Sequence, residues 1–243
     1  MKADPRVTVW KNAEALSVAA AHFFVANCHR CIAKKGRFVV ALSGGNTPKM
    51  FFQLLASVAF SRNISWKNVF LFWSDERFVP HTDPESNYRM AKENLLTHIQ
   101  IPAENIFPVP VNTGPKEDAT EYEAVIRKFF NHKKPVFDWL LLGLGDDGHT
   151  ASLFPQTAIL REKKRWIKEV WVESKQNWRI SFTLSLINKA AQVVFIVAGK
   201  EKAPVVATIL QRKKTRPLLP AQLVAPSKGT ICWMLDEEAA ANI

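Results

Sequence analysis

The chain has 243 residues, of which 47% are hydrophobic and 23% are charged, and its formal net charge is +11. This balance excludes a disordered chain, and the 9 glycines and 14 prolines form no periodic run of the collagen-like or low-complexity kind. No apolar stretch approaches the roughly 18–20 residues that a membrane-spanning helix needs, so we expect a soluble protein.

Strand and helix patterns alternate along the chain. In chain order we predict a strand at 6–9, a helix at 12–33, a strand at 38–42, a helix at 48–57, a strand at 69–73 and a helix at 87–97. The later elements that we predict are a helix at 119–130, strands at 137–143, 167–172, 179–184 and 192–198, and helices at 204–211 and 236–241.

The order of these elements predicts the fold class. A continuous apolar run such as residues 38–42 (FVVAL) is typical of a strand buried on both faces of a parallel sheet. The repeated strand–helix–strand pattern therefore predicts an α/β protein. We expect one domain over residues 1–243, without an internal repeat or linker, and interpret the proline-rich stretch at 102–115 as a surface connection.

Three predicted strands lead directly into polar or glycine-rich loops. These loops comprise residues 43–48 (SGGNTP), 74–80 (SDERFVP) and 143–150 (GLGDDGHT). In open α/β sheets, ligands bind beyond the carboxyl ends of the strands. We therefore expect the functional site where these three loops meet.

The loop at 43–48 has the composition of an anion site. Gly44 and Gly45 allow backbone N–H groups to approach an anion closely. Asn46 and Thr47 add polar side chains before the helix, whose dipole attracts negative charge. The lysine and the spacing of a P-loop are missing, so nucleotide binding is not indicated. A phosphate site and an ordinary strand-to-helix turn both fit these residues.

The loop at 143–150 contains the candidate catalytic base. Gly143, Gly145 and Gly148 match a dinucleotide fingerprint, but no helix of useful length follows, so we interpret them as freeing the loop to project polar side chains. His149 follows Asp147 by two residues, and a neighbouring carboxylate orients a histidine and makes it more basic. The alternative is a histidine that only caps the following turn.

The loop at 74–80 places two acids and a guanidinium at a strand end. Arg77 is able to clamp an anion through two parallel hydrogen bonds, or to pair internally with Asp75 or Glu76. The residues alone leave both interpretations open.

Basic residues cluster at 34–37, 127–134, 161–168 and 212–216. These clusters lie mostly at predicted helix ends and in loops, which favours solvated faces and helix C-termini over a nucleic-acid recognition surface. The net charge alone therefore identifies no partner.

The cysteine pattern indicates reduced thiols. Cys28, Cys31 and Cys232 are an odd number in a chain whose N-terminal segment does not resemble a secretory signal, so we expect a cytoplasmic protein. Cys28 and Cys31 share one face of a predicted helix, where small buried side chains explain them best. No metal-ligand spacing and no G-x-S-x-G elbow occur, so we predict no metal, no cofactor and no serine-hydrolase mechanism.

Several motifs in order, over nearly the whole chain, resemble the glucosamine-6-phosphate isomerase/6-phosphogluconolactonase family. The motifs are residues 43–48, 74–80, 86–88, 179–184, 199–203 and 220–221 with the later Trp233 and Asp236, and the most specific block, 143–155 (GLGDDGHTASLFP). The deaminases of this group typically have Asp-Glu-Tyr in the second loop and a glutamate shortly after the Gly-His of the third. This chain has Arg77 and Phe154 at those positions, which favours the lactonase branch. A deaminase, and a non-catalytic sugar-phosphate or nucleic-acid binder, are the alternatives.

The resemblance implies a Rossmann-like three-layer α/β/α fold with a mostly parallel sheet, related to the glucosamine-6-phosphate deaminase and ribose-5-phosphate isomerase folds. It also implies hydrolysis of 6-phospho-D-glucono-1,5-lactone to 6-phosphogluconate in the pentose phosphate pathway. The only partner then expected is the small phosphosugar lactone, without nucleic acid, membrane or cofactor, and the enzyme is a monomer or a small homo-oligomer.

The resemblance further assigns roles near the lactone. His149 is the general base that activates water, and Asp147 either orients His149 or contacts substrate hydroxyls. Arg77 positions the lactone and offsets the charge that grows on its oxygens, whereas Asp75 supports the site or contacts a hydroxyl.

The phosphate-binding residues implied by the resemblance are Gly44, Gly45, Asn46 and Thr47, with Arg179 and Lys202 supplying positive charge.

Two features depart from the family pattern. Residues 176–178 stand where the family tends to be proline-rich, which leaves the aim of Arg179 open, and the basic stretch 161–168 has no assigned counterpart.

Overall fold

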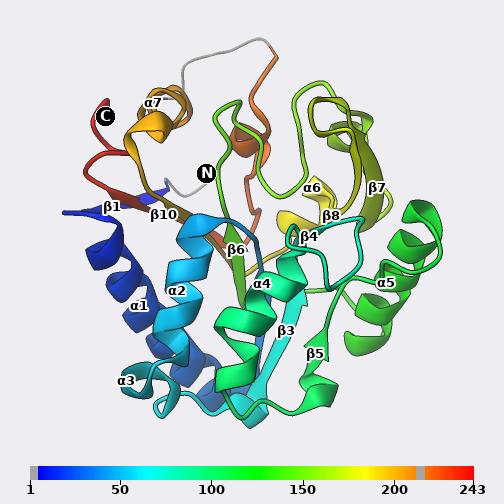
Figure 1. Ribbon diagram of the computed structural model, residues 1–243, viewed down its shortest axis with the longest axis horizontal. Helices are drawn as coiled ribbons and strands as arrows, with labels where there is room; N and C mark the ends of the chain where they lie inside the picture. Colours follow the sequence, from blue (N-terminus) through cyan, green and yellow to red (C-terminus); the bar gives the residue numbers. More distant parts are fainter. Residues whose placement is uncertain (1–4, 212–216) are drawn as a thin grey trace.

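A computed structural model of the chain describes residues 5–211 and 217–243 (Figure 1). The basic cluster at 212–216 therefore lies outside the described residues. Within them, no helix is both long enough and apolar enough to cross a membrane.

The centre of the molecule is a seven-stranded parallel sheet with the strand order β1-β10-β9-β6-β2-β3-β5. Its strands are β1 (Arg6–Trp10), β2 (Phe38–Leu42), β3 (Val69–Trp73), β5 (Ile106–Phe107), β6 (Trp139–Leu142), β9 (Gln192–Val197) and β10 (Thr230–Asp236). Every residue of β2, β6 and β9 is buried, as expected for strands covered on both faces.

The helices are α1 (Ala13–Lys35), α2 (Asn46–Ala56), α3 (Val58–Ser61), α4 (Asn87–Asn94), α5 (Pro115–Phe129), α6 (Leu184–Ile187) and α7 (Ala203–Leu210). Local signals set the ends of α1. The side chain of Asn12 accepts a hydrogen bond from the N–H of Ala15 (2.9 Å), and Gly36 ends the helix with a φ of 74°.

Adjacent residues of β3 show that helices cover both faces of the sheet. Phe72 contacts Phe129 of α5 with ring centroids 5.1 Å apart, whereas Trp73 contacts Tyr88 of α4 at 5.3 Å. Successive side chains of a strand point to opposite faces, so α4 and α5 lie on opposite sides. Because α1 and α2 pack in a row beside α4 (Figure 1), the predicted three-layer α/β/α arrangement is confirmed.

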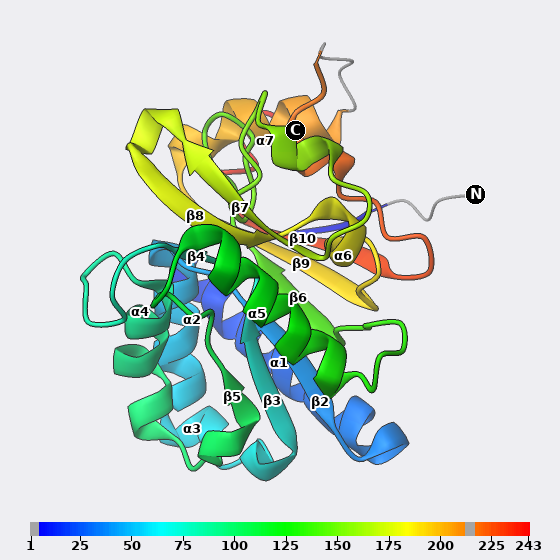
Figure 2. The same cartoon turned by 90° about the vertical axis from the view of Figure 1, so that its right-hand side faces the viewer.

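A second sheet stands beyond the carboxyl end of β3, in the upper left of Figure 2. It has three antiparallel strands, β4 (Asp75–Arg77), β8 (Asn177–Phe182) and β7 (Ile167–Val172), in the order β4-β8-β7. Only Ser74 separates the end of β3 from the start of β4, so the chain passes directly from the main sheet to the second sheet.

The structure corrects the predicted helix at 236–241. The chain forms the strand β10 up to Asp236, and residues 237–242 are turns. The alanine-rich composition of this segment favoured a helix, but the preceding residues pair on both sides, with β1 and with β9. Asp236 then accepts hydrogen bonds from the N–H groups of Ala239 (2.8 Å) and Gly199 (3.1 Å), which fixes the turn.

Two of the five basic residues at 161–168 pair with acids of the same surface. Arg165 pairs with Glu169 (3.3 Å) and lies 3.6 Å from Glu123 of α5, and Lys168 pairs with Glu162 (3.0 Å). These pairs tie β7 to α5 at the periphery and give this part of the stretch a structural interpretation.

Candidate active site

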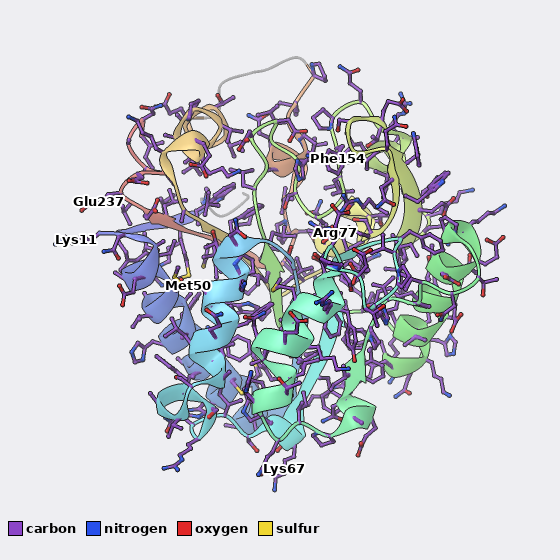
Figure 3. The ribbon with its side chains drawn as sticks, viewed as in Figure 1. Lys11, Met50, Lys67, Arg77, Phe154 and Glu237 are labelled. Carbon is purple, nitrogen blue, oxygen red and sulfur yellow. The ribbon has the colours of Figure 1, made fainter. Side chains whose placement is uncertain are left out.

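A cavity of about 420 Å³ lies at the carboxyl end of the main sheet, where the three predicted loops meet. Every residue predicted for the site lines it, with the exception of Asp147. Arg77 reaches it from the second sheet, and Phe154 from the loop after β6 (Figure 3). Lys67, also labelled there, marks the opposite end of the sheet.

His149 and Asp147 form a hydrogen-bonded pair in the loop after β6. Nδ1 of His149 lies 2.6 Å from Oδ1 of Asp147, and the backbone N–H of His149 donates to the same oxygen (3.0 Å). An ionised carboxylate only accepts hydrogen bonds, so Nδ1 carries a proton and Nε2 of the neutral imidazole keeps its lone pair. Asp147 therefore lies behind the histidine and outside the cavity lining.

The rest of this loop holds the imidazole in place. The N–H of Gly145 donates to the carbonyl of His149 (2.9 Å), and Gly148 turns the chain with a φ of 77°. A Cβ on Gly145 would lie 2.0 Å from Nδ1 of His149, so only glycine fits there. On the cavity side Phe154 stacks on the imidazole, with ring centroids 4.0 Å apart.

The electrostatics of the pair keep Asp147 ionised. Partial burial on its own would raise the pKa of Asp147, but its hydrogen bonds from the side chain and backbone of His149 outweigh that effect and lower the pKa below its usual value. The carboxylate is thus available to stabilise a proton on the imidazole.

Arg77 and Arg179 stand side by side at the other side of the cavity, because they are directly paired across β4 and β8. Arg179 is only 7% exposed. Burial first, and then the nearby charge of Arg77, lower the pKa of Arg179. Within the described residues, Nε of both arginines has no hydrogen-bond partner and neither takes part in an ion pair. Asp75, Glu85 and Glu76 are near enough to raise the pKa of Arg179, but none of them forms an ion pair with either arginine. Two adjacent guanidinium groups of this kind form a candidate binding site for an anion.

The loop at 43–48 completes this cationic side. Gly45 has a φ of 116°, and α2 starts at Asn46, two residues earlier than predicted. The first N–H groups of a helix have no acceptor within the helix and attract anions. A Cβ on Gly44 would lie 1.8 Å from Oδ1 of Asn87, so the side chain of Asn87 sits directly on this turn.

Two further predicted residues already have partners. The buried carboxylate of Asp75 accepts a hydrogen bond from the hydroxyl of Ser152 (2.7 Å). The ammonium group of Lys202 lies 2.5 Å from Oδ1 of Asp146, in the loop that also contains His149. Both residues line the cavity, but each is held by a neighbour.

Several polar residues of the lining were given no role from the sequence, among them Asn87, Ser152, Lys175 and Glu201. Ser152 belongs to the block 143–155, and Glu201 directly precedes Lys202. Both residues therefore lie within the motifs, but nothing in their sequence context distinguished them from neighbouring residues as part of the site. Lys175 lies in the turn between β7 and β8, and the sequence made no prediction of the conformation of this turn. Among the described residues, no group of three or more His, Cys, Asp or Glu side chains is arranged to hold a metal ion.

The comparison with known proteins decides the family. Residues 11–233 match the family model described as glucosamine-6-phosphate isomerases/6-phosphogluconolactonase. The chain belongs to this family.

Relatives in this family are similar over their whole length. The chain is 39% identical to the 6-phosphogluconolactonase of Synechocystis sp., with 98% of each chain covered, and 35% identical to that of Homo sapiens, with 96% and 92% covered. The structure of 6-phosphogluconolactonase from Trypanosoma cruzi matches with a TM-score of 0.89 at 30% identity, covering 100% of this chain and 98% of that one. A monomeric glucosamine-6-phosphate deaminase shares the fold, with a TM-score of 0.83 at 21% identity and 98% and 100% covered.

Proposed function

We propose that this chain is a 6-phosphogluconolactonase, which hydrolyses 6-phospho-D-glucono-1,5-lactone to 6-phospho-D-gluconate, the second step of the oxidative pentose phosphate pathway. One observation carries the proposal beyond the family: His149, hydrogen-bonded to Asp147, lines the same cavity as the adjacent Arg77 and Arg179, neither of which forms an ion pair within the described residues. A base and an anion site in one cavity are what hydrolysis of a phosphorylated lactone needs.

The cationic side of the cavity takes the phosphate. The turn of Gly44 and Gly45 and the first residues of α2, Asn46 and Thr47, offer backbone N–H groups. Arg179 adds a guanidinium, and Lys202 adds an ammonium group when the phosphate replaces Asp146 as its partner. The dianionic phosphate is then the counterion of these cationic groups.

The chemistry follows from the free Nε2 of His149. This nitrogen accepts a proton from water while the water oxygen adds to C1 of the lactone. The resulting oxyanion is offset by the charge of Arg77, and the imidazolium is stabilised by Asp147. When the bond between C1 and the ring oxygen breaks, Nε2–H returns the proton to that oxygen, and the carboxylic acid then ionises in water.

Phe154 favours this reaction over deamination. At the position where the deaminases typically have a glutamate, the structure has an aromatic ring stacked on His149 at 4.0 Å. A phenyl ring transfers no proton, so the ring-opening step of an aminosugar phosphate has no carboxylate there. Release of ammonia from glucosamine 6-phosphate is therefore the less favoured activity.

The proposal includes a cytoplasmic enzyme that acts as a monomer or small homo-oligomer. The three cysteines are free thiols, which suits a reducing compartment.

The test is the initial rate of hydrolysis of freshly generated 6-phosphogluconolactone, coupled to NADP reduction by 6-phosphogluconate dehydrogenase and corrected for spontaneous opening. We expect the wild type to exceed the spontaneous rate and His149→Ala to lose most of the excess. A wild type no faster than the spontaneous reaction would overturn the proposal, and ammonia release from glucosamine 6-phosphate would then be measured.

A further inference from the structure

Glu76 is a buried acid next to the cavity that the proposed reaction does not use. It lies on β4 between Asp75 and Arg77, and because side chains alternate along a strand, it points away from the face that carries them. Glu76 is buried, with only 1% of its surface exposed. Within the described residues it takes part in no ion pair, and it is absent from the cavity lining.

The carboxylate of Glu76 accepts four hydrogen bonds. Oε1 accepts from the backbone N–H groups of Arg77 (2.8 Å) and Asn87 (2.7 Å). Oε2 accepts from the N–H of Tyr88 (2.8 Å) and the hydroxyl of Ser86 (3.0 Å). Two of these donors belong to the first turn of α4, whose N–H groups lack acceptors within the helix and whose dipole favours a negative charge.

These bonds connect three parts of the cationic side. Through its backbone, Arg77 is fixed at the position from which its guanidinium enters the cavity. Through α4, Asn87 is fixed where its side chain covers Gly44 and its Nδ2 donates to the carbonyl of Asp75 (2.9 Å). The intervening loop returns to the same point, since Nη1 of Arg77 donates to the carbonyl of Glu85.

We propose that Glu76 is a positioning residue for substrate binding: by bonding Arg77 and the first turn of α4 together, it sets the aim of Arg77 and the place of Asn87 on the phosphate-binding turn. The inference rests on the proposed function, in which Arg77 and the turn at Gly44 contact the substrate. It gives Glu76 no contact with the substrate itself.

Burial supports a functional reason for this acid. Desolvation raises the pKa of Glu76 to about 7, although its hydrogen bonds with Tyr88, Asn87, Arg77 and Ser86 act in the opposite direction. An ionisable acid thus occupies this position in spite of the unfavourable desolvation of its charged form, and strongly perturbed acids of this kind gather at functional sites.

The test compares Glu76→Gln with a matched buried acid. The amide keeps the shape of the side chain but replaces one accepting oxygen with a donor, so two of the four donors lose their acceptor. We expect KM for the lactone to rise about tenfold. Because Arg77 also offsets the charge of the oxyanion, kcat should fall as well, but by a smaller factor than KM rises, since the loop of His149 is separate. The Kd of 6-phosphogluconate, measured by calorimetry, rises by the same factor.

Asp118→Asn is the control. Asp118 is also fully buried and accepts backbone hydrogen bonds, from Asn112 (2.6 Å) and Thr113 (3.1 Å), but it is absent from the cavity lining. A purely structural role for Glu76 predicts that both variants lose thermal stability and keep KM. That result, or a fall in kcat with KM unchanged, would overturn the inference.

Ser86→Ala covers the case in which Glu76→Gln fails to fold. Ser86 does not line the cavity, and its hydroxyl donates to Oε2 of Glu76. The same hydroxyl caps α4 by accepting a hydrogen bond from the N–H of Arg89 (3.1 Å). We expect a KM increase of about twofold to threefold, transmitted through Glu76 and the first turn of α4; an unchanged KM would contradict the inference. If the wild type has no lactonase activity, the proposed function fails by itself, and the Kd of inorganic phosphate for these variants still tests the positioning role.

Discussion

The two sides of the cavity are built in different ways. The reaction side, Asp147, His149 and Phe154, belongs to a single loop, and its polar groups are partly solvated, with side-chain exposures of 29% for His149 and 47% for Asp147. The binding side depends on Arg77 and Arg179, which come from two strands far apart in the sequence and meet by antiparallel register. Arg179 is almost fully buried.

This difference separates two tasks. A loop that places its base through contacts within a few residues is able to change protonation without disturbing the core. A binding side made from paired strands and a buried carboxylate holds its charges in place before the substrate arrives, so little ordering is required on binding. We therefore expect substitutions on the reaction side to change kcat, and substitutions at Arg179 and the phosphate-binding turn to change KM, whereas a substitution of Arg77, which also offsets the oxyanion, should change both.

The largest effect is expected for His149→Ala. Loss of a general base lowers kcat by about 10²–10⁴-fold. The side chain is partly exposed in a loop, so thermal unfolding of the variant should match the wild type. Initial rates with the lactone and a thermal melt check this. An increase of KM as large as the fall in kcat would break the separation between the two sides.

Arg179→Met comes next. Methionine fills much of the same buried space, but it removes one of the two guanidinium groups and leaves the anion with fewer charge-assisted hydrogen bonds. At about 1.5–3 kcal/mol for such a bond, KM should rise about tenfold to a hundredfold with kcat nearly unchanged. The control is Arg89→Gln, which removes an arginine that pairs with Glu93 outside the cavity and should leave KM unaltered.

Asp147→Asn is expected to lower kcat by about tenfold, because an amide keeps one accepting oxygen but no longer stabilises the imidazolium.

The lowered pKa of Asp147 sets the sign of a pH effect: the carboxylate stays ionised to lower pH than an ordinary aspartate, and its contribution to stability is lost only as pH falls through that lowered value. Thermal melts from neutral to acidic pH should show this loss in the wild type and not in the variant.

The smallest effect is expected for Asp146→Asn. In the ion pair of Asp146 with Lys202 the side chain of Asp146 is exposed to solvent. Exposed ion pairs of this kind contribute about 0.2–1 kcal/mol to stability. Its removal frees the ammonium group for phosphate, so KM should fall about twofold at low salt, and the difference should shrink as salt screens the charges. A rise in KM would show instead that Asp146 positions Lys202.

The same contrast explains what the sequence made predictable. The pair of Asp147 and His149 is two residues apart on a loop after a buried strand, so local pattern was sufficient to predict its presence. Arg77 and Arg179 were each predicted by resemblance, but their side-by-side placement depends on the pairing of β4 with β8, a long-range contact that no local pattern specifies. Three of the four bonds of Glu76 also depend on the path of the chain, because residues 86–88 return to the strand that carries Glu76.

The error in the fold has a related cause. The alanine-rich segment after Asp236 has local helix propensity, but sheet pairing on both sides of β10 and the bonds of the Asp236 carboxylate determine the structure there. Long, strongly apolar elements such as Phe38–Leu42 and Val69–Trp73 were predicted with the bounds that the structure shows, because burial on both faces leaves them little choice. The prediction of one domain stays a prediction.

Phosphate binding and proton transfer are expected to depend on separate sides of one cavity. The most direct test is a calorimetric titration of 6-phosphogluconate into His149→Ala. We predict a Kd within about twofold of the wild type, since no group of the binding side is altered. A variant that binds 6-phosphogluconate tenfold or more weakly than the wild type would contradict the account.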